Sequence, residues 1–173
     1  MQSNPTKELF FFDEALFGTH SKLGHGWFSK GTRTLMKVKL GFQNFYVFSA
    51  VNVKSGQDFS YVMPAVNTQT MNEFLVILSR ELGEKHAIVV MDCAGWHKSK
   101  DLKIPENIEI IYLPPYSPEL NPVEKLWQYI KSHTIKNRIY ETLQDLEDVI
   151  CQFIRDLNPA LIAKTCSIKH CLN

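Results

Sequence analysis

The sequence predicts an α/β fold, a mixed sheet of about five strands in which an antiparallel three-strand meander is joined to parallel strands and flanked by helices. Three patterns support this. Short apolar runs come first, a helical period then separates two further apolar runs, and helical periods fill the last third. The chain has 173 residues, 45% of them hydrophobic, which is enough for one well-buried core.

The meander is predicted from the N-terminal third. Residues Glu8 to Asp13 form a short apolar run ending in an acid, and Phe45 to Val53 is rich in aromatic and β-branched residues. Lys54-Ser55-Gly56-Gln57 supplies turn residues before the next apolar run, Phe59 to Met63. We therefore expect the second and third strands to form an antiparallel hairpin.

A helix is predicted next, followed by two buried strands. Thr70 and Glu73 have capping-box spacing, and Gly83 stands where the helix would stop. Apolar residues recur between them at helical intervals: Met71, Phe74, Leu75, Leu78 and Leu82. Ala87 to Met91 and Ile108 to Leu113 are nearly continuous apolar runs, which is typical of central strands covered on both faces.

Two helices are expected to close the chain. The first opens at Asn121-Pro122, because Asn can cap a helix and Pro suits its first position. The second opens at Thr142, and Asn158-Pro159 ends it. Its apolar face consists of Leu143, Leu146, Val149, Ile150, Phe153, Ile154 and Leu157.

The net charge of +1 conceals two basic stretches that contain no acidic residue. The first runs from Ala15 to Gln57 and carries Lys22, Lys30, Arg33, Lys37, Lys39 and Lys54. The second follows Glu124 as far as Tyr140 and carries Lys125, Lys131, Lys136 and Arg138. A polyanion could bind at either stretch, and acids that are nearby only in space could equally balance both.

Membrane, secretory and zinc-ribbon classes are not indicated. No stretch approaches the roughly 20 apolar residues of a membrane span, and the N-terminus lacks a signal-peptide pattern, so we expect a cytoplasmic protein. None of the cysteines has C-x-x-C spacing, which argues against a disulfide framework or a zinc site: Cys93, Cys151, Cys166 and Cys171.

Two acids follow apolar strands. If the strands ending at Asp13 and Asp92 are parallel neighbours, both carboxylates emerge at the carboxyl edge of the sheet. Adjacent carboxylates repel unless they bind a cation or share a proton, and oxygen ligands favour Mg²⁺ or Mn²⁺. Either acid alone could instead be a turn or capping residue. Glu14 is a substitute ligand, but strand alternation should point it away from the face of Asp13.

The segment from Leu113 to Trp127 is the most informative part of the sequence. It reads Leu-Pro-Pro-Tyr-Ser-Pro-Glu-Leu-Asn-Pro-Val-Glu-Lys-Leu-Trp. Glu124 falls three residues after Asn121, so it could simply close a capping box. The apolar face of this helix comprises Val123, Leu126, Trp127 and Ile130. Glu124 lies at its margin, where a rigidly held carboxylate can face the edge of the sheet.

Together, Phe12-Asp13-Glu14, the run from Met91 to His97 and the proline-rich segment resemble the motifs of mariner-like DDE transposases, most of all their bacterial insertion-sequence-630 branch. The resemblance extends from Phe10 to Leu157. It implies an RNase-H-like fold with Asp13, Asp92 and Glu124 as the catalytic, metal-binding triad. In such enzymes two divalent ions, Mg²⁺ or Mn²⁺, assist an in-line attack on phosphorus. The element is cut from donor DNA and inserted at a TA dinucleotide.

Two features depart from this family. Cys93 stands where many relatives have Asn, and a small buried thiol is its expected role. Relatives also carry an N-terminal helix-turn-helix region, whereas here Asp13 comes almost at once. We therefore expect residues 1–173 to form a single catalytic domain without the DNA-recognition domain. One frame of a two-frame gene, a trimmed derivative and a decayed copy would all keep this fold.

The resemblance implies DNA as the partner, both transposon ends and target, with a homodimer assembled on it in the bacterial nucleoid. A separately encoded N-terminal DNA-binding portion would be a further partner. Expected DNA contacts are Trp27, Lys30, Arg33, Lys37, Lys39, His97, Lys125 and Lys131. Trp27 could equally be core, and His97 could cap the following segment. The alternatives are another RNase-H-like nuclease and an inactive, transposase-derived module.

Overall fold

The computed structural model describes residues 7–19, 43–136 and 138–167. Its strands form one five-stranded sheet in the order β3-β2-β1-β4-β5. Their bounds are β1 Glu8–Gly18, β2 Asn44–Val51, β3 Asp58–Met63, β4 Ala87–Met91 and β5 Ile108–Tyr112. β1 pairs with β2 and β2 with β3 in antiparallel fashion, whereas β1–β4 and β4–β5 are parallel. The predicted mixed sheet, a meander joined to parallel strands, is confirmed.

The hairpin between β2 and β3 depends on an Asn and a Gly. Asn52 Oδ1 accepts hydrogen bonds from the amides of Lys54 and Ser55 at 3.1 and 3.2 Å, which forms an Asx-type turn. Gly56 has a φ of +74°, and a Cβ there would stand 1.8 Å from the carbonyl oxygen of Pro159. The turn therefore requires Gly at this position both for its backbone conformation and for its packing against the C-terminal helix.

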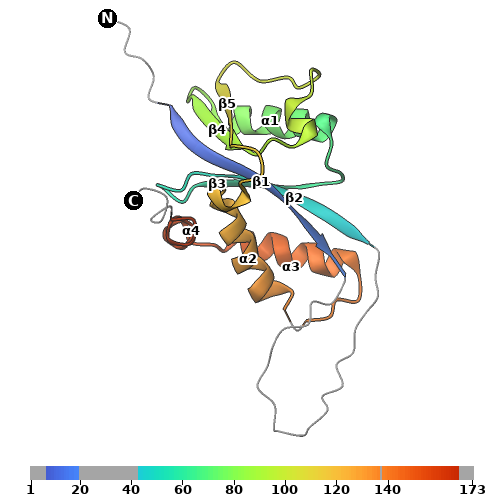
Figure 1. Ribbon diagram of the computed structural model, residues 1–173. Coiled ribbons are helices and arrows are strands. Elements are labelled where there is room, and N and C mark those ends of the chain that lie inside the picture. Colours follow the sequence, from blue (N-terminus) through green and yellow to red (C-terminus); the bar gives the residue numbers. More distant parts are fainter. Residues whose placement is uncertain (1–6, 20–42, 137, 168–173) are drawn as a thin grey trace, which may run out of the picture.

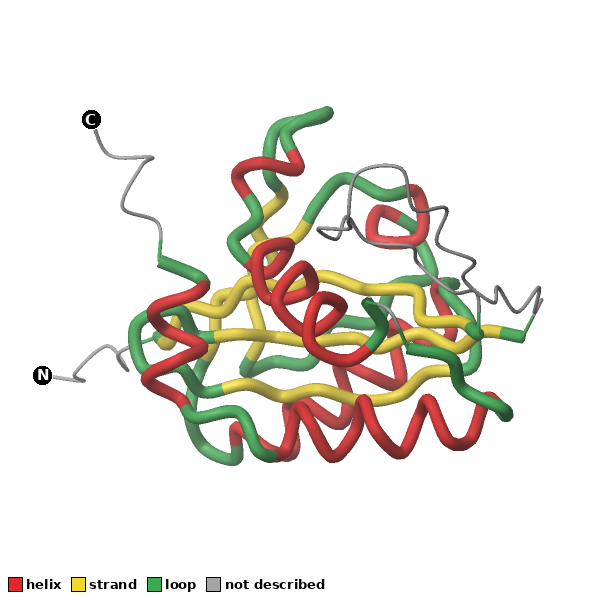
Figure 2. The backbone as a smooth tube through the Cα atoms, turned by 90° about the horizontal axis from the view of Figure 1, so that it is seen from below, coloured by secondary structure: helices red, strands yellow, loops and turns green. Residues whose placement is uncertain are grey.

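Helices cover both faces of the sheet (Figure 1). α1 (Thr68–Leu82) lies on one face, and α2 (Val123–Thr134), α3 (Leu143–Arg155) and α4 (Pro159–Thr165) lie on the other. Figure 2 shows the strands between these helical layers. Among the described helices, none is long and apolar enough to cross a membrane.

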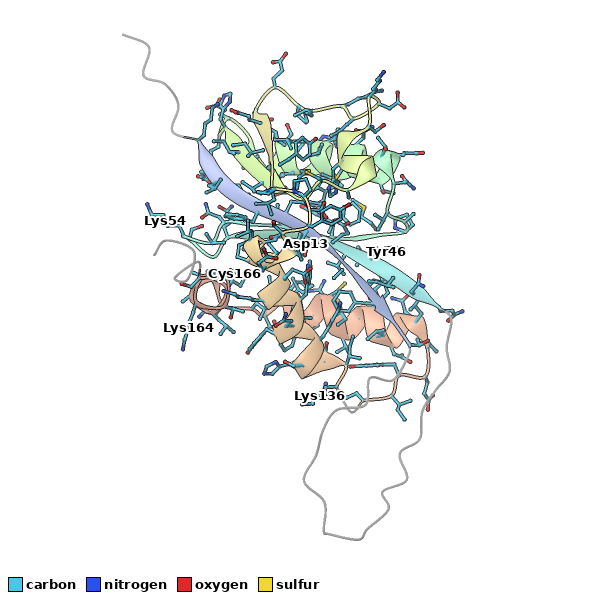
Figure 3. The ribbon with its side chains drawn as sticks, viewed as in Figure 1. Asp13, Tyr46, Lys54, Lys136, Lys164 and Cys166 are labelled. Carbon is cyan, nitrogen blue, oxygen red and sulfur yellow. The ribbon has the colours of Figure 1, made fainter. Side chains whose placement is uncertain are left out.

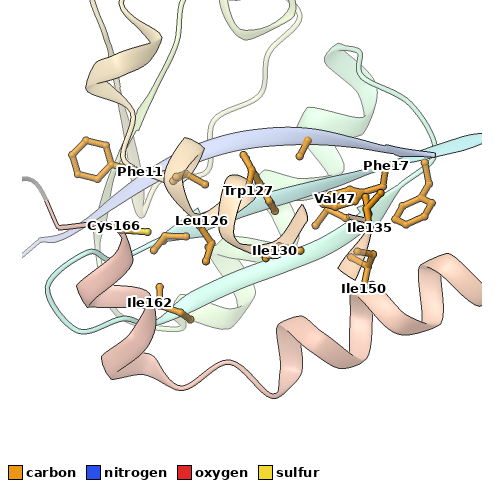
Figure 4. Packing of buried hydrophobic residues seen from close by; sticks show 14 of the residues in the cluster. Phe11, Phe17, Val47, Leu126, Trp127, Ile130, Ile135, Ile150, Ile162 and Cys166 are labelled. Carbon is orange, nitrogen blue, oxygen red and sulfur yellow. The ribbon is translucent and has the colours of Figure 1, made fainter. Parts of the chain in front are cut away.

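The core is divided in two because successive strand side chains point to opposite faces. From β1, Phe10 and Phe12 belong to the cluster under α1, whereas Phe11 and Phe17 belong to the cluster under α2, α3 and α4. Figure 4 shows the second cluster, in which Trp127 and its neighbours on α2 pack against the sheet. At about 25 cal/mol per Å² of apolar area, each buried aromatic contributes on the order of 2 kcal/mol or more.

Two helix predictions need correction. The capping box of α1 joins Asn67 to Thr70 rather than Thr70 to Glu73, since the Asn67 side chain accepts from the Thr70 amide at 2.9 Å. Asn158-Pro159 ends α3 as expected, but it also begins α4, a helix that the sequence did not predict. Asn158 caps that helix by accepting from the Ala160 amide at 2.8 Å. An Asn-Pro pair therefore both terminates one helix and starts another.

Two strand predictions also need correction. β1 does not end at Asp13 but continues to Gly18, because the residues after Asp13 stay paired with β2. β5 was expected to be covered on both faces, yet it is the edge strand, and Ile111 is 45% exposed. β4, in contrast, is central, and its apolar run is buried as predicted.

Candidate active site

Asp13 lies within the sheet, beside the point where β1 and β4 part (Figure 3). The parallel pairing of these strands ends at Phe11 and Val90. In the same register Asp13 comes level with Asp92, the residue that follows β4. The two aspartates are therefore neighbours at the carboxyl edge of parallel strands, as the sequence predicted, although β1 itself continues beyond them.

Asp13 faces the α2 layer and is held there by an indole. Trp127 Nε1 donates a hydrogen bond to Asp13 Oδ2 at 3.0 Å. Trp127 is only 2% exposed, so its position is set by core packing. The pKa of Asp13 is raised to about 8, first by burial and then by the nearby carboxylates of Glu124 and Glu14. The bond from Trp127 opposes this shift without cancelling it. Among the described residues, none adds a positive charge that compensates Asp13.

Glu14 faces the opposite side of the sheet, as strand alternation predicted, yet it remains part of the same electrostatic group. Its pKa is raised to about 7, first by burial and then by the carboxylates of Asp92 and Glu124. Its Oε2 atom is buried and has no hydrogen-bond partner among the described residues. The sequence did not predict that Glu14 belongs to this group, because strand alternation describes β1 alone and not the loop carrying Asp92 that approaches it. The acidic residue directly after Asp13 was the available signal.

Asp92 stands at the rim, in contact with a buried histidine. Its side chain is 54% exposed, and Oδ1 accepts from the Ala94 amide at 3.1 Å. The same Oδ1 atom lies 2.7 Å from Nδ1 of His97, which is only 1% exposed and packs edge-on against Phe12. Burial lowers the pKa of His97, and Asp92 opposes that shift. The phosphate contact expected for His97 is not accessible to a ring buried in this way. The alternative, in which His97 has a local role in its own segment, fits the structure better.

Glu124 occupies the first turn of α2, and Asn121 fixes where that helix begins. Asn121 is 4% exposed, and its side chain donates to the Phe12 carbonyl at 2.8 Å and accepts from the Val123 amide at 3.2 Å. The Asn121 amide itself donates to Pro118, so the predicted capping box with Glu124 is not formed. Glu124 is exposed and raises the pKa of both Asp13 and Glu14. It therefore faces the acids of β1, as expected from its place on the helix margin.

The expected DNA contacts divide into two groups. Five of them lie outside the described residues: Trp27, Lys30, Arg33, Lys37 and Lys39. Lys125 and Lys131 are on α2, where the Lys125 ammonium donates to the Ser167 carbonyl at 3.1 Å. The Lys131 ammonium lies 5.3 Å from the ring centre of Phe17, a cation–π distance.

Cys93 is half-buried, and its thiol donates to the Leu113 carbonyl at 3.1 Å.

The donor set fits a hard divalent cation in its chemistry. Asp13, Asp92 and Glu124 supply only oxygen ligands, and burial, together with the carboxylates of Glu124 and Glu14, raises the pKa of Asp13. Within the described part of the chain, no three His, Cys, Asp or Glu side chains lie close enough together to hold a metal ion. For these carboxylates to hold one cation together, the exposed side chain of Asp92 or Glu124 has to turn towards Asp13.

This sheet order, with helices on both faces and acids beside the ends of β1 and β4, defines the RNase-H-like class of catalytic folds. Solved protein structures share this fold. The Mos1 strand transfer complex matches with a TM-score of 0.72 and 14% identity, over 92% of this chain and 50% of that one. The Mos1 mariner paired end complex with Mn matches with a TM-score of 0.71 and 14% identity, over 92% and 51%. Identity this low establishes the fold alone.

Residues 8–147 match the DDE superfamily endonucleases, and the chain belongs to that family. It is 39% identical over 107 residues to the uncharacterized protein y4pE/y4sA of Sinorhizobium fredii (strain NBRC 101917 / NGR234), covering 61% of this chain and 79% of that protein. It is 24% identical over 159 residues to the insertion element IS630 uncharacterized 39 kDa protein of Shigella sonnei, covering 87% and 46%. The predicted membership of the DDE endonucleases is confirmed, and the chain is similar to a protein of insertion element IS630.

The chain spans about half the length of the IS630 protein and of the Mos1 chains.

Proposed function

We propose that this chain is the catalytic part of a DNA transposase that cuts DNA strands and joins them to new sites, with Asp13, Asp92 and Glu124 holding two Mg²⁺ or Mn²⁺ ions. The observation that carries the proposal is the partly buried Asp13. Its charge is opposed by burial and by two other carboxylates, in a family of endonucleases. A carboxylate is costly in such a place unless a cation or a proton neutralises it.

The ions, when bound, would activate the attacking oxygen and stabilise the leaving oxygen at phosphorus. The residues of the chain divide the remaining work. Asp13 is held rigidly by Trp127 and by its place in the sheet. Because its pKa is about 8, Asp13 is mostly protonated at neutral pH without a cation, so cation binding is coupled to loss of that proton. Asp92 and Glu124, which are exposed at the rim, can turn to complete the set.

DNA is the proposed substrate. The basic residues Lys125 and Lys131 lie on α2, the helix that also carries Glu124. Ammonium groups bind the DNA backbone without reading its sequence. A duplex held along this helix would therefore bring its phosphates close to the carboxylates. By likeness to the Mos1 complexes we extend the proposal to transposon ends and target DNA, to a homodimer assembled on DNA in the bacterial nucleoid, and to insertion at TA.

Nicking of supercoiled plasmid tests the catalytic proposal. The wild-type chain should nick it with Mg²⁺ or Mn²⁺ and not with EDTA, because the acids alone cannot stabilise the leaving oxygen. Absence of nicking by folded protein with either ion would favour the inactive-module alternative. Sequencing of joined products tests the finer point, since insertions spread over non-TA sites would contradict the TA preference.

A further inference from the structure

The contacts of His97 define a support for Asp92. The His97 Nδ1 atom lies 2.7 Å from Asp92 Oδ1 and 3.2 Å from the Asp92 carbonyl oxygen. Both neighbours are acceptors, so Nδ1 must carry the proton and donate. The Ala94 amide donates to the same Oδ1 at 3.1 Å. One carboxylate oxygen thus receives two donors, and no contact among the described residues engages Oδ2.

The imidazole is itself held from several sides. Its ring packs edge-on against Phe12, with centroids 5.5 Å apart, and the Tyr112 hydroxyl donates to the His97 carbonyl. Nε2 faces Glu14 Oε2 at 3.7 Å. Since Phe12 and Glu14 flank Asp13 in β1, His97 connects the loop bearing Asp92 to the strand bearing Asp13. A ring this well buried can restrain an exposed carboxylate that would otherwise rotate freely.

We propose that His97 is a positioning residue, whose Nδ1–H anchors Oδ1 of Asp92 so that Oδ2 is presented to the cation beside Asp13. This inference rests on the proposed function. Groups that hydrogen-bond to metal ligands typically change metal affinity by about 10- to 100-fold when removed. The effect of His97 on metal binding should therefore be measurable without DNA or turnover.

Two amide variants separate the hydrogen bond from ring packing. In His97→Asn the amide nitrogen can take the position of Nδ1, whereas in His97→Gln it reaches the position of Nε2. Both variants lose the ring against Phe12, so their difference isolates the donor. Titrated with Mn²⁺ in the absence of DNA, His97→Asn should bind within about threefold of wild type and His97→Gln about tenfold more weakly or worse. Thermal melting of both checks folding.

Several outcomes overturn the proposal. The proposal would be overturned if folded wild type and His97→Gln bound Mn²⁺ with equal affinity. It would also be overturned if His97→Asn and His97→Gln lost Mn²⁺ affinity to the same extent. Wild-type protein that binds no Mn²⁺ would overturn the proposed function as well, so the two failures are distinguishable. A second readout needs no metal. In nitrogen-15 NMR of the metal-free protein the proton of His97 should reside on Nδ1, and a proton on Nε2 alone would contradict the anchor.

A second inference comes from the pocket next to Asp92. It has a volume of about 600 Å³, and the described residues of its lining include prolines, an aromatic ring and small side chains but no Lys or Arg: Asp92, Cys93, Ala94, Pro114, Pro115, Tyr116, Ser117 and Pro118. Tyr116 is fully exposed and has a φ of +60°, the only positive φ of a non-glycine residue within the described ranges. That backbone costs roughly 1–3 kcal/mol, so its presence beside a site indicates a use.

We infer that this pocket receives an unpaired nucleobase next to the scissile phosphate, with the Tyr116 ring as its stacking partner. The prolines and the Tyr116 ring suit the face of a base, and the described lining residues include no cation that would bind a phosphate. The inference rests on the proposed function, because Asp92 at the margin of the pocket locates the reacting phosphate. A base displaced from the duplex would lie within one nucleotide of it.

The test uses a duplex with a 3′ overhang of five thymidines and its counterpart with an abasic overhang, bound in Ca²⁺. Stacking contributes about 1–3 kcal/mol per base, so wild type should prefer the thymidine overhang about tenfold. Tyr116→Phe keeps the ring and should retain the preference. Tyr116→Asn tolerates the positive φ but lacks the ring, and it should lose the preference. A wild type without preference, or a Tyr116→Asn variant that keeps it, would overturn the inference, whatever the nicking assay shows.

Discussion

Asp13 and Asp92 come level on adjacent strands, yet their surroundings differ. Asp13 is enclosed in the sheet and oriented by the buried Trp127, whereas Asp92 is half exposed at the rim and restrained by His97. The interior acid is positioned by the whole core, and the rim acid by a short loop. The structure therefore combines a rigidly held carboxylate with adjustable carboxylates at the surface, which suits the proposed site, where a cation and DNA would bind.

The largest expected effect comes from the rim. Asp92→Asn keeps the shape of the side chain but removes a ligand charge, so nicking should fall at least about a thousandfold, on the order of 4 kcal/mol. Stability should be unchanged or slightly higher, because repulsion with Glu14 is relieved. Asp148→Asn on α3 is a matched control and should nick normally. Wild-type turnover by Asp92→Asn would place the site elsewhere.

A smaller effect is expected for the support of the interior acid. Trp127→Phe removes the donor to Asp13 and should cost about 1–3 kcal/mol in the free energy of unfolding, together with some packing loss. A double-mutant cycle with Asp13→Ala isolates the hydrogen bond from that packing loss. Coupling near zero in urea unfolding would show that the indole does not hold the carboxylate.

The pH dependence of stability distinguishes the interior from the rim. Since the pKa of Asp13 is about 8 in the fold against 3.8 as a free group, unfolding releases a proton between these values. Stability in EDTA is therefore full below about pH 4 and should fall as pH rises to about 8, shifting the melting temperature by a few degrees. Glu14 acts in the same direction up to about 7.

Two comparisons make this pH test specific. Asp13→Asn should flatten the fall, because its amide does not ionise. Mg²⁺ at pH 8 should restore stability by binding the folded state. A wild-type melting temperature that rises throughout this range in EDTA would contradict a raised pKa for Asp13.

The smallest effect concerns DNA affinity. If Lys125 and Lys131 each neutralise a phosphate, the slope of log affinity against log salt should flatten by about 0.9 for each Lys→Ala change. Specific and scrambled duplexes should behave alike, because phosphate contacts carry no sequence information. Lys85→Ala, near the opposite end of β4, serves as a control. An unchanged slope in the double variant would exclude α2 from the DNA path.

Much of the fold could be predicted from local patterns. The strand β4, the hairpin and the Thr142 start of α3 follow from apolar runs, turn residues and capping, which are properties of short segments. The errors occurred where an element depends on a distant partner. β1 continues past Asp13 because β2 pairs with it, and β5 is an edge strand because no further strand among the described residues joins it.

The choice of the three acids as site residues is a prediction made from apolar runs, a helix start and motifs that resemble those of one family. Their environment could not be predicted in this way. Trp127 is 114 positions from Asp13, and only packing of α2 against β1 brings its indole to the carboxylate. The burial of His97 and the approach of Asp92 to Glu14 likewise depend on how loop and strand meet. Spacing along the chain thus determined which residues could act, whereas desolvation and distance, which exist only in the folded molecule, decided how each is charged and held.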